Sequence, residues 1–247
     1  MQDIIESKEY FLSKVAQELG LNNDSKIVEF GSGQSRAVLP LLNTFPQMSY
    51  LGIEPSAKDA AVAKELVKNF KNARVLNQLA YDEAPGAGDF DLCFSLSVLE
   101  HVKQLEKFLS NSVKAVRSGG RIIHRYDLGH ALRPSSAKER FQVFLGNTFP
   151  SLLPEHKFVR YLSDEEVREI LEKYGARVEK KTYHQMPNHK ALLKVFRADS
   201  EPKRRLIEQM MDWEQDISPY LEGMEKRERE MLFPGIALWA RRAEVGE

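Results

Sequence analysis

One short stretch, Val28–Ser35, constrains the fold of this chain more than any other part of it; it reads Val-Glu-Phe-Gly-Ser-Gly-Gln-Ser. The apolar run that ends at Glu29 has the length and composition of a buried strand. Gly31 and Gly33 then allow a tight turn and a close approach of the backbone to a ligand, because neither carries a side chain. Ser35 is placed to open a helix. A strand, a glycine turn and a helix in this order are typical of the nucleoside-binding corner of a doubly wound α/β sheet.

The residues around this turn favour a cationic nucleoside over a dinucleotide. A dinucleotide site has a third glycine three residues after the second, and Arg36 stands there instead. Glu29 would attract a cation and repel phosphates. Glu54 closes the next apolar run, about 20 residues after the glycines, where such folds place an acid against ribose hydroxyls. One acid for a cation and one for a ribose fit S-adenosylmethionine better than NAD.

Four segments of the chain resemble the class I S-adenosylmethionine-dependent methyltransferases, in particular the small-molecule, type 11-like members. The segments lie in the family's order and at its intervals, at residues 29–33, 52–56, 90–102 and 118–121. Together they cover roughly residues 25–126. The resemblance implies a Rossmann-like α/β fold, with a doubly wound, seven-stranded and mostly parallel sheet that carries helices on both faces.

The resemblance also implies which residues hold S-adenosylmethionine, with S-adenosylhomocysteine as the product. Glu29 and the glycine turn would face the methionine part, and Glu54 the ribose hydroxyls. After the third strand, where the family places an acid near the adenine, this sequence has none at the expected position. The residues assigned to the cofactor are Glu29, Gly31, Ser32, Gly33, Glu54, Pro55, Ser56, Leu79, Ala80, Ser95 and Leu96.

Length and composition limit the classes of protein that this chain can be. With 247 residues, of which 42% are hydrophobic, it can form one large domain with its own core. The formal net charge of zero gives no basic field for a nucleic acid. A single cysteine, Cys93, excludes an intrachain disulfide, and no residue spacing predicts a metal site. The sequence lacks a secretory signal and a membrane-spanning run, so we expect a cytoplasmic protein that binds neither nucleic acid nor membrane.

Hydrophobic periodicity predicts alternating strands and helices, and therefore right-handed crossovers in a parallel sheet. A helix is expected over residues 3–19, and Pro40 predicts a kink or a late start in the helix after the glycine turn. Gly119 and Gly120 are expected to turn the chain into the fifth strand. The predicted strands are residues 26–30, 49–53, 74–77, 90–95, 121–126, 178–185 and 235–242.

We expect a single domain over residues 1–247, with three additions to the sheet. Residues 1–20 form an N-terminal helix that can act as a lid over the cofactor. Residues 127–162, rich in aromatic side chains and without clean periodicity, form a substrate-pocket insertion at the carboxyl end of a strand. Residues 188–233 form a mostly helical insertion near the C-terminus, where the resembled family joins its last two strands by a short turn.

Methyl transfer from a sulfonium is an in-line displacement with an activated leaving group, so the protein mainly aligns the donor with the acceptor. A base is needed only where the acceptor must lose a proton before attack. Histidine has the side-chain pKa nearest neutrality. His130, after the fifth strand, is therefore the first candidate, and His101, after the fourth, is the second. Asp127 could orient a histidine or bind an amine, whereas His124 lies inside a strand and is expected to pack there.

Four further residues are candidates for contact with the acceptor: Tyr10, Tyr126, Arg160 and Tyr161. Tyr10 lies on the predicted lid, and Tyr126 ends the fifth strand. Arg160 and Tyr161 could contact an acidic substrate, although two adjacent polar residues are also typical of an ordinary surface pair.

The sequence therefore predicts an enzyme that transfers a methyl group from S-adenosylmethionine to oxygen or nitrogen of a small or medium-sized metabolite. Two alternatives stay open. A non-catalytic cofactor-binding or scaffold protein would use the helical insertion to hold a partner. A nicotinamide-dependent oxidoreductase is disfavoured by Arg36 and Glu29. The sequence does not decide between a monomer and a homodimer.

Overall fold

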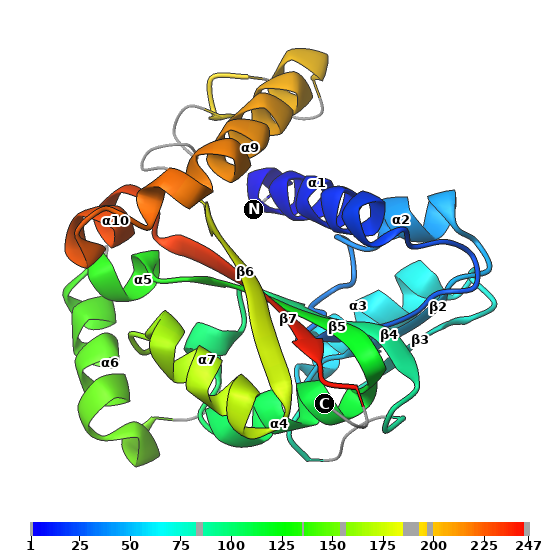
Figure 1. Cartoon of the computed structure of the whole chain (residues 1–247), viewed down its shortest axis with the longest axis horizontal. Coiled ribbons are helices and arrows are strands. Elements are labelled where there is room, and N and C mark those ends of the chain that lie inside the picture. Colours follow the sequence, from blue (N-terminus) through cyan, green and yellow to red (C-terminus); the bar gives the residue numbers. More distant parts are fainter. Residues whose placement is uncertain are drawn as a thin grey trace.

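Seven strands pair in the order β3-β2-β1-β4-β5-β7-β6, and helices cover both faces of the sheet (Figure 1). Neighbouring strands are parallel except at β7, which runs antiparallel to β5 and β6. This confirms the expected Rossmann-like class. The computed structural model describes residues 2–82, 86–134, 136–153, 157–184, 193–196 and 200–244, without the side chains of residues 2–6 and 130. The strands are β1 (Lys26–Phe30), β2 (Ser49–Ile53), β3 (Ala73–Leu76), β4 (Phe90–Leu96), β5 (Val116–Asp127), β6 (Ala176–His184) and β7 (Gly235–Arg242).

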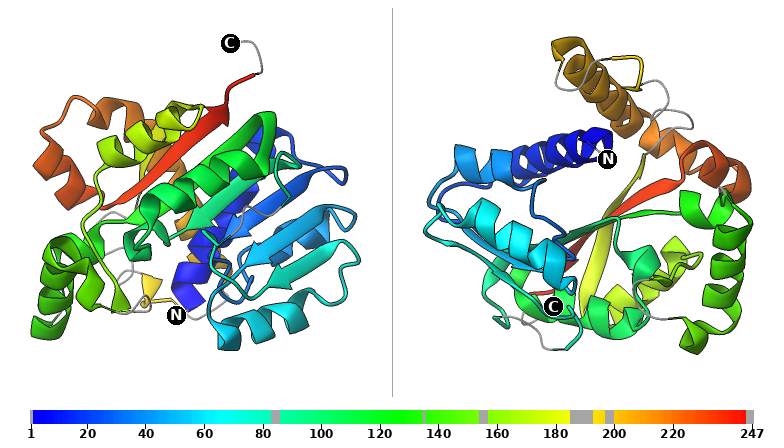
Figure 2. Two further views of the ribbon diagram at one scale, coloured as in Figure 1. Left: turned by 90° about the horizontal axis from the view of Figure 1, so that it is seen from below. Right: turned by 180° about the vertical axis from the view of Figure 1, so that it is seen from behind.

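Two groups of helices enclose the sheet, as the two views of Figure 2 show. Their apolar side chains form one core on each face. One face is covered by α1 (Gln2–Leu19), α2 (Leu39–Thr44), α3 (Ala57–Val67) and α9 (Glu201–Leu221), and the other by α4 (Leu105–Ala115) and α7 (Asp164–Lys173). The remaining described helices are η1 (Leu99–His101), α5 (Gly129–Leu132), α6 (Ala137–Thr148), η2 (Pro150–Leu152) and α10 (Lys226–Leu232).

β1 shows how the sequence specifies the two faces. Ile27 packs in the core on the α1 side, whereas Val28 and Phe30 pack in the core on the α4 side. Because side chains alternate along a strand, Glu29 lies on the same face as Ile27. All four side chains are buried, since helices cover both faces of a parallel sheet. The acid at the end of β1 is therefore enclosed beneath α1.

Local signals fix where several helices begin. α2 starts only at Leu39, with Pro40 in its first turn, so the expectation of a late start is confirmed. Ser56 caps α3 by accepting the N–H of Asp59 at 3.3 Å. Ser163 caps α7 in the same way, by accepting the N–H of Glu166 at 3.1 Å.

The predicted start of the fifth strand after Gly119 and Gly120 is wrong, although the backbone does fold back here, where a Cβ on Gly120 would lie 2.8 Å from the Arg117 carbonyl oxygen. β5 begins at Val116 and continues through both glycines. The pairing with β4 shifts between Phe90 and Leu92, which marks an irregularity in the ladder at this point. Gly119 has a φ of 71°, a conformation that glycine adopts without steric cost. The glycines therefore let β5 bulge and continue instead of starting it.

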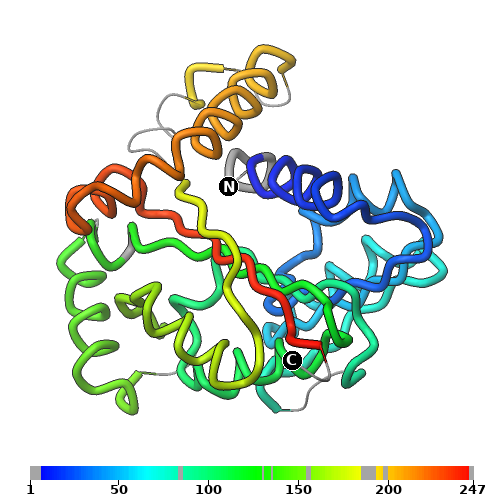
Figure 3. Tube along the Cα trace, in the orientation of Figure 1, coloured from blue at the N-terminus to red at the C-terminus, as the bar shows by residue number. Residues whose placement is uncertain are grey.

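The chain leaves the sheet after β6 and returns to it in β7 by way of α9 and α10. His184 at the end of β6 lies opposite Gly235 at the start of β7. Between these two residues, α9 packs against α1, and both helices lie at the top of the trace in Figures 1 and 3. The segment between the last two strands thus covers the same face of the sheet as the N-terminal helix.

The aromatic-rich segment after β5 folds into α5, α6 and η2. Three of its aromatic side chains, Phe141, Phe144 and Phe149, are 61%, 54% and 51% exposed. They belong to α6 or follow it directly, on the left of Figure 1, away from α1 and α9. In this structure these three side chains lie on the surface, so their part in an acceptor pocket stays a prediction.

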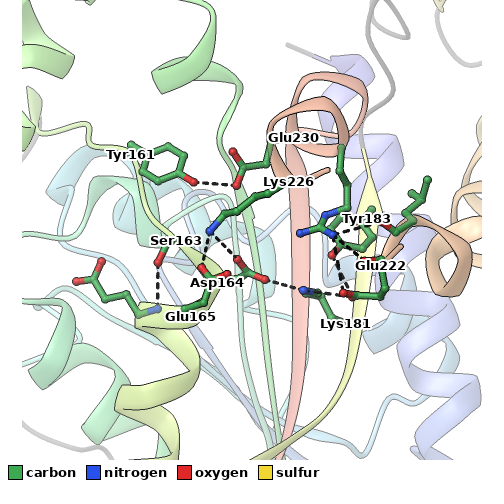
Figure 4. Close-up of polar contacts among 12 residues, drawn as sticks. Tyr161, Ser163, Asp164, Glu165, Lys181, Tyr183, Glu222, Lys226 and Glu230 are labelled. Atoms are coloured by element: carbon green, nitrogen blue, oxygen red, sulfur yellow. Dashed lines mark hydrogen bonds and ion pairs between the residues drawn. The ribbon is translucent and has the colours of Figure 1, made fainter. Parts of the chain in front are cut away.

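An ion-pair network fixes the end of α9 and the start of α10 to the sheet (Figure 4). Lys181 Nζ on β6 lies 2.6 Å from Asp164 Oδ2 and 3.2 Å from Glu222 Oε1. Lys226 Nζ on α10 lies 2.6 Å from Glu165 Oε2 and 3.7 Å from Asp164 Oδ1. Burial works to raise the pKa of Asp164, but Lys181 outweighs it and holds that pKa at about 2.

Two tyrosines extend this network. The Tyr183 hydroxyl on β6 lies 3.0 Å from Glu222 Oε1, and the Tyr183 N–H donates to Ser218 Oγ on α9 at 2.9 Å. The Tyr161 hydroxyl donates to Glu230 Oε1 on α10 at 2.8 Å. The helices between β6 and β7 are therefore held from two sides, by β6 and by the segment before α7.

Replacing Asp164 by asparagine removes the charge between the two lysines and keeps the side-chain shape. We expect the free energy of unfolding at pH 7 to fall by about 1.5–3 kcal/mol, the usual worth of a hydrogen bond to a charged group. A carboxyl with a depressed pKa stabilises the fold above its unfolded-state pKa and loses that effect as the pH falls toward 2. In urea unfolding, the difference between the two proteins should therefore narrow below about pH 4.

The neighbouring exposed acid, Glu165, provides the control. Its pair with Lys226 is solvated, so Glu165→Gln should change the free energy of unfolding little. Equal losses in both variants would contradict the particular role of Asp164.

Candidate functional site

The carboxyl ends of β1, β2 and β4 meet at the glycine turn. Gly31 and Gly33 have φ angles of 76° and 53°, in the left-handed region that favours glycine. A Cβ atom at Gly31 would lie 2.6 Å from Val98 Cγ2, in the segment after β4. The positive φ and the close Val98 side chain together favour glycine at position 31.

Two serines beside the turn adopt the same left-handed conformation. Ser35 has a φ of 55° and Ser97 a φ of 60°. In any residue other than glycine this conformation costs about 1–3 kcal/mol, and such strained residues cluster at functional sites. Ser35 follows β1 after the glycine turn, and Ser97 directly follows β4, the strand paired with β1. The backbone strain is therefore concentrated at two adjacent strand ends.

Glu54, just beyond β2, is held by the backbone on both sides. Its Oε2 accepts the N–H of Gly33 at 2.7 Å, and its Oε1 accepts the N–H of Ser56 at 2.8 Å. Burial raises the pKa of Glu54, and these two N–H groups oppose the rise. Each carboxylate oxygen keeps acceptor capacity for a further donor, such as a ribose hydroxyl.

Glu29 is buried beside the turn and shares a proton network with Tyr50. The Tyr50 hydroxyl donates to Glu29 Oε2 at 2.7 Å and lies 2.9 Å from Ser35 Oγ. Burial raises the pKa of Glu29 to about 7, and Tyr50 and Lys8 oppose the rise. Near neutral pH the carboxyl is thus half ionised, and a cation placed beside it would favour the charged form.

The loop after β3 places an acid, Asp82, near the position predicted for the adenine, although its place in the sequence does not indicate this. Asp82 Oδ2 accepts the N–H of Leu79 at 3.3 Å, so this carboxylate lies beside the residue predicted to meet the adenine. Asn77 Nδ2 donates to the carbonyl oxygens of Glu54 and Pro55, at 2.8 and 3.0 Å. The strand ends of β2 and β3 are therefore tied together.

Helix α1 crosses the strand ends with Lys8 facing them. Lys8 Nζ donates to the carbonyl oxygen of Leu96, the last residue of β4, at 2.7 Å. Burial lowers the pKa of the Lys8 ammonium, and the charge of Arg125 acts in the same direction, whereas the charges of Glu29, Glu100 and Asp127 favour the protonated form. The structure therefore already places one ammonium group among three carboxyl groups at this edge of the sheet.

Glu100, on η1, is the most deeply enclosed of these acids. It is 0% exposed. Its Oε1 accepts the N–H of Asp127 at 3.3 Å, and its Oε2 has no hydrogen-bond partner among the described residues. Burial raises the pKa of Glu100 to about 8, and the neighbouring Asp127 raises it further. Buried polar atoms are rarely left unsatisfied in native proteins, so this oxygen is a candidate acceptor for a donor of a ligand.

Arg125, on β5, lies between the strand ends and the helices that cover them. It is 3% exposed, and its Nε and Nη1 have no hydrogen-bond partner in the described part of the chain. Its guanidinium carbon lies 5.0 Å from the centre of the Phe11 ring. Burial lowers its pKa, and the charges of Glu214 and Asp127 oppose this. Arg125 lines a cavity of about 20 Å³ with Ser7, Leu193, Ile207, Met210, Met211 and Glu214.

Comparison of the sequence with protein families gives a match over most of the chain. Residues 4–181 match the family described as "Methyltransferase domain". The chain belongs to this methyltransferase family. A comparison with curated proteins gave no match.

Solved methyltransferase structures share the fold at low sequence identity. A putative sarcosine dimethylglycine methyltransferase from Galdieria sulphuraria has 12% identity and a TM-score of 0.63, over 96% of this chain and 85% of that one. A geranyl diphosphate C-methyltransferase from Streptomyces coelicolor A3(2), solved with Mg²⁺, geranyl diphosphate and S-adenosylhomocysteine, has 14% identity and a TM-score of 0.60, over 94% and 79%. Phosphoethanolamine N-methyltransferase 2 from Haemonchus contortus, solved with S-adenosylmethionine, has 17% identity and a TM-score of 0.59, over 94% and 52%.

In the methyltransferase, the residues predicted for the cofactor lie at one edge of the sheet. They follow or end β1, β2, β3 and β4, which are parallel neighbours, so their carboxyl ends are at the same edge. Ser95 is committed to an internal contact, because its Oγ lies 2.8 Å from His124 Nδ1. The carbonyl of Ala80 accepts Asn111 Nδ2 at 3.0 Å. Their roles toward a cofactor stay predictions.

The histidines of the methyltransferase lie in three different settings. His124 is packed inside the sheet as expected, with its Nε2 3.1 Å from Ser112 Oγ, and burial lowers its pKa to about 3. His101 is exposed, and its Nδ1 lies 2.9 Å from the carbonyl oxygen of Phe158. The side chain of His130 lies outside the described residues, so its role as a base stays a prediction.

The four residues predicted to contact the acceptor are scattered. The Tyr10 hydroxyl donates to Asp212 Oδ1 on α9 at 3.1 Å, which joins the two covering helices. Tyr126 is fully buried in the core on the α4 side. Arg160 pairs with Glu166 at 2.8 Å, and Tyr161 bonds to α10 as described above. Arg160 and Tyr161 are thus each bonded to another side chain of the protein. The arginine that lines the cavity described above is Arg125.

Sequence patterns do not single out Lys8, Tyr50, Glu100 or Arg125. A weak signal exists for Arg125, which lies inside the strand predicted over residues 121–126 and therefore needs a partner when buried. Lys8 carries no such signal, because a lysine is ordinary on an amphipathic helix.

Two further findings concern metals and membranes. In the part of the chain that the structure describes, no group of three histidine, cysteine or acidic side chains is placed to hold a metal ion. Within the same part, no helix combines the length and the apolar composition needed to cross a membrane.

Replacing Glu29 by glutamine removes a carboxyl group that burial makes costly to ionise. Because the folded-state pKa of about 7 lies above the unfolded value, the folded state binds the proton more tightly. The stability that this tighter proton binding contributes is therefore lost as the pH rises from about 4.5 to 7. When the pH is raised from 5 to 8, the unfolding free energy of Glu29→Gln should therefore rise by about 1–3 kcal/mol relative to that of the wild type.

Urea unfolding at the two pH values measures this gain. Glu18→Gln on α1 is a suitable control, because Glu18 pairs with Lys180 near the surface. If the unfolding free energies of Glu29→Gln and the wild type change with pH in parallel, the pKa of Glu29 is not raised in the folded protein.

Proposed function

We propose that this methyltransferase transfers a methyl group from S-adenosylmethionine to oxygen or nitrogen of a small or medium-sized metabolite, with S-adenosylhomocysteine as the product. The observation that carries the cofactor assignment is the pair of acids on either side of the glycine turn. Glu54 is fixed by two N–H groups and keeps acceptor capacity for a ribose. Glu29, with its pKa near neutrality, suits the cationic end of the ligand.

The polar groups of the site fit this cofactor better than a dinucleotide. Gly31 packs against the Val98 side chain, whereas a Cβ at Gly33 would meet nothing within 4 Å, so the turn is open at Gly33 and a ligand can approach its backbone there. The orphaned Glu100 Oε2 and the carbonyl of Leu96 are acceptors for positively charged donors. A phosphate beside Glu29 and Glu100 would oppose the ionisation of both carboxyl groups, whereas a cation would favour their charged forms. The same arrangement therefore argues against NAD.

The cofactor supplies a methyl group on a positively charged sulfur, which is already activated for displacement. The protein's own residues then have to hold the acceptor in line and exclude water. Helices α1 and α9 lie over the strand ends and are joined by Tyr10 and Asp212. The cavity at Arg125, about the size of one water molecule, lies between these helices and the end of β5, and we place the acceptor on this side.

An acceptor that must lose a proton needs a base within hydrogen-bond reach. Among the predicted candidates, Asp127 lies at the end of β5, where its Oδ1 accepts the N–H of Gly129 at 2.7 Å. His130 follows in α5 and stays the proposed base, oriented by Asp127. His101 is less suitable, because its ring nitrogen is engaged with Phe158.

Isothermal titration calorimetry on the purified protein tests the cofactor assignment. S-adenosylmethionine and S-adenosylhomocysteine should bind with micromolar affinity, and NAD should not bind. Glu54→Ala should weaken S-adenosylhomocysteine binding by about 1.5–3 kcal/mol, since it removes charged acceptors of the ribose hydroxyls.

Glu65→Ala on α3 is the matched control, because Glu65 is exposed and pairs only with Lys68 among the interactions described. Its binding curve should match that of the wild type. Unchanged affinity in Glu54→Ala would reject the ribose contact, and binding of NAD in place of S-adenosylhomocysteine would reject the proposed function.

A further inference from the structure

The ammonium group of Lys8 lies where we place the amino group of the cofactor's methionine part. Its Nζ donates to the Leu96 carbonyl at 2.7 Å. Glu29, Glu100 and Asp127 are the acids whose charges act on it. Glu29 is assigned above to the methionine part of the cofactor, and the Leu96 carbonyl is proposed as an acceptor for the cofactor's positively charged donors. A primary ammonium that donates to a carbonyl oxygen near carboxylates is the contact that the α-amino group of methionine requires.

The backbone presents this carbonyl through a strained turn. Leu96 is the last residue of β4, and Ser97 follows it with a φ of 60°. The N–H of Ser97 donates to the carbonyl oxygen of Arg125 at 2.6 Å, so β5 holds the turn in place. Strain of this kind persists where the surrounding structure enforces it and a function uses it. The acceptor site at Leu96 thus belongs to the sheet, and Lys8 is the donor that α1 brings to it.

Two ammonium groups cannot use this site together. Two like charges a few ångströms apart repel each other strongly where burial lowers the effective dielectric constant. The carbonyl of Leu96 also has limited room for a second charged donor. A ligand that brings its own amino group must therefore displace Lys8, whereas a ligand without one need not.

We propose that Lys8 is a specificity-determining residue that occupies the site of the cofactor's amino group and must withdraw before the amino-acid part of the cofactor binds. The inference rests on the proposed function. Only the side chain has to move, because the next turns of α1 are anchored: Tyr10 donates to Asp212 Oδ1 at 3.1 Å, and Lys14 Nζ lies 2.9 Å from the same oxygen. Only the fraction of molecules in which Lys8 has withdrawn can bind a ligand with an amino-acid part, so the apparent affinity for such ligands is lowered.

Two ligands separate this effect from nucleoside binding. S-adenosylhomocysteine carries the amino-acid part, and 5′-methylthioadenosine has the same nucleoside and a thioether without it. In isothermal titration calorimetry, Lys8→Met should bind S-adenosylhomocysteine about fivefold or more tightly than the wild type, since the competing ammonium is gone. Its affinity for 5′-methylthioadenosine should be unchanged. Lys8→Gln, which keeps a polar donor but no charge, should also bind S-adenosylhomocysteine more tightly than the wild type.

Lys14→Met is the matched control, because it removes a lysine from the same helix at a contact with α9 instead of the strand ends. It should leave the ratio of the two affinities unchanged, and thermal unfolding confirms that each variant is folded. If the wild type binds S-adenosylhomocysteine but Lys8→Met binds it equally or more weakly, Lys8 is a partner of the cofactor and the inference is overturned. If neither protein binds either nucleoside, the proposed function fails, and the inference fails with it.

Discussion

Charges buried where β1, β4 and β5 end are the constraint on which the rest of this structure depends. An isolated charge in a protein interior is costly unless it is paired and hydrogen-bonded. Here Glu29 has Tyr50, Lys8 has the Leu96 carbonyl, and Arg125 has the face of Phe11. These partners come from neighbouring strands and from α1. The covering helices are therefore part of the site, because without them the charges would face water and lose the perturbed pKa values that a ligand can use.

Burial also changes which groups titrate near neutral pH in this part of the structure. A histidine is the natural choice of base when only unperturbed pKa values are considered. In the fold, burial moves His124 out of the neutral range, to a pKa of about 3. The same burial brings Glu29 to about 7 and Glu100 to about 8. At these strand ends, carboxyl groups therefore titrate where histidines ordinarily do.

What the sequence predicts well is what short segments decide for themselves. The bounds of β1, β2 and β7 agree with the predicted strands, because a buried strand needs only its own apolar run and a turn. The late start of α2 follows from Pro40 alone. The course of β5 through Gly119 depends instead on the shifted register of β4, a partner that no local pattern reveals. The role of Lys8 is hidden for the same reason, since it exists only because α1 crosses the end of β4.

The pairing of His184 with Gly235 has a consequence for how this protein can change. The chain leaves the sheet and returns to it at a single rung of the β6–β7 ladder, so everything between is an excursion from what would otherwise be a hairpin turn. Such an excursion can lengthen, shorten or exchange its helices while every strand keeps its register. Helices α9 and α10 are thereby separated along the chain from the glycine turn and from Glu29 and Glu54, which lie in its first part. These helices can therefore vary while the turn and the two acids stay unchanged.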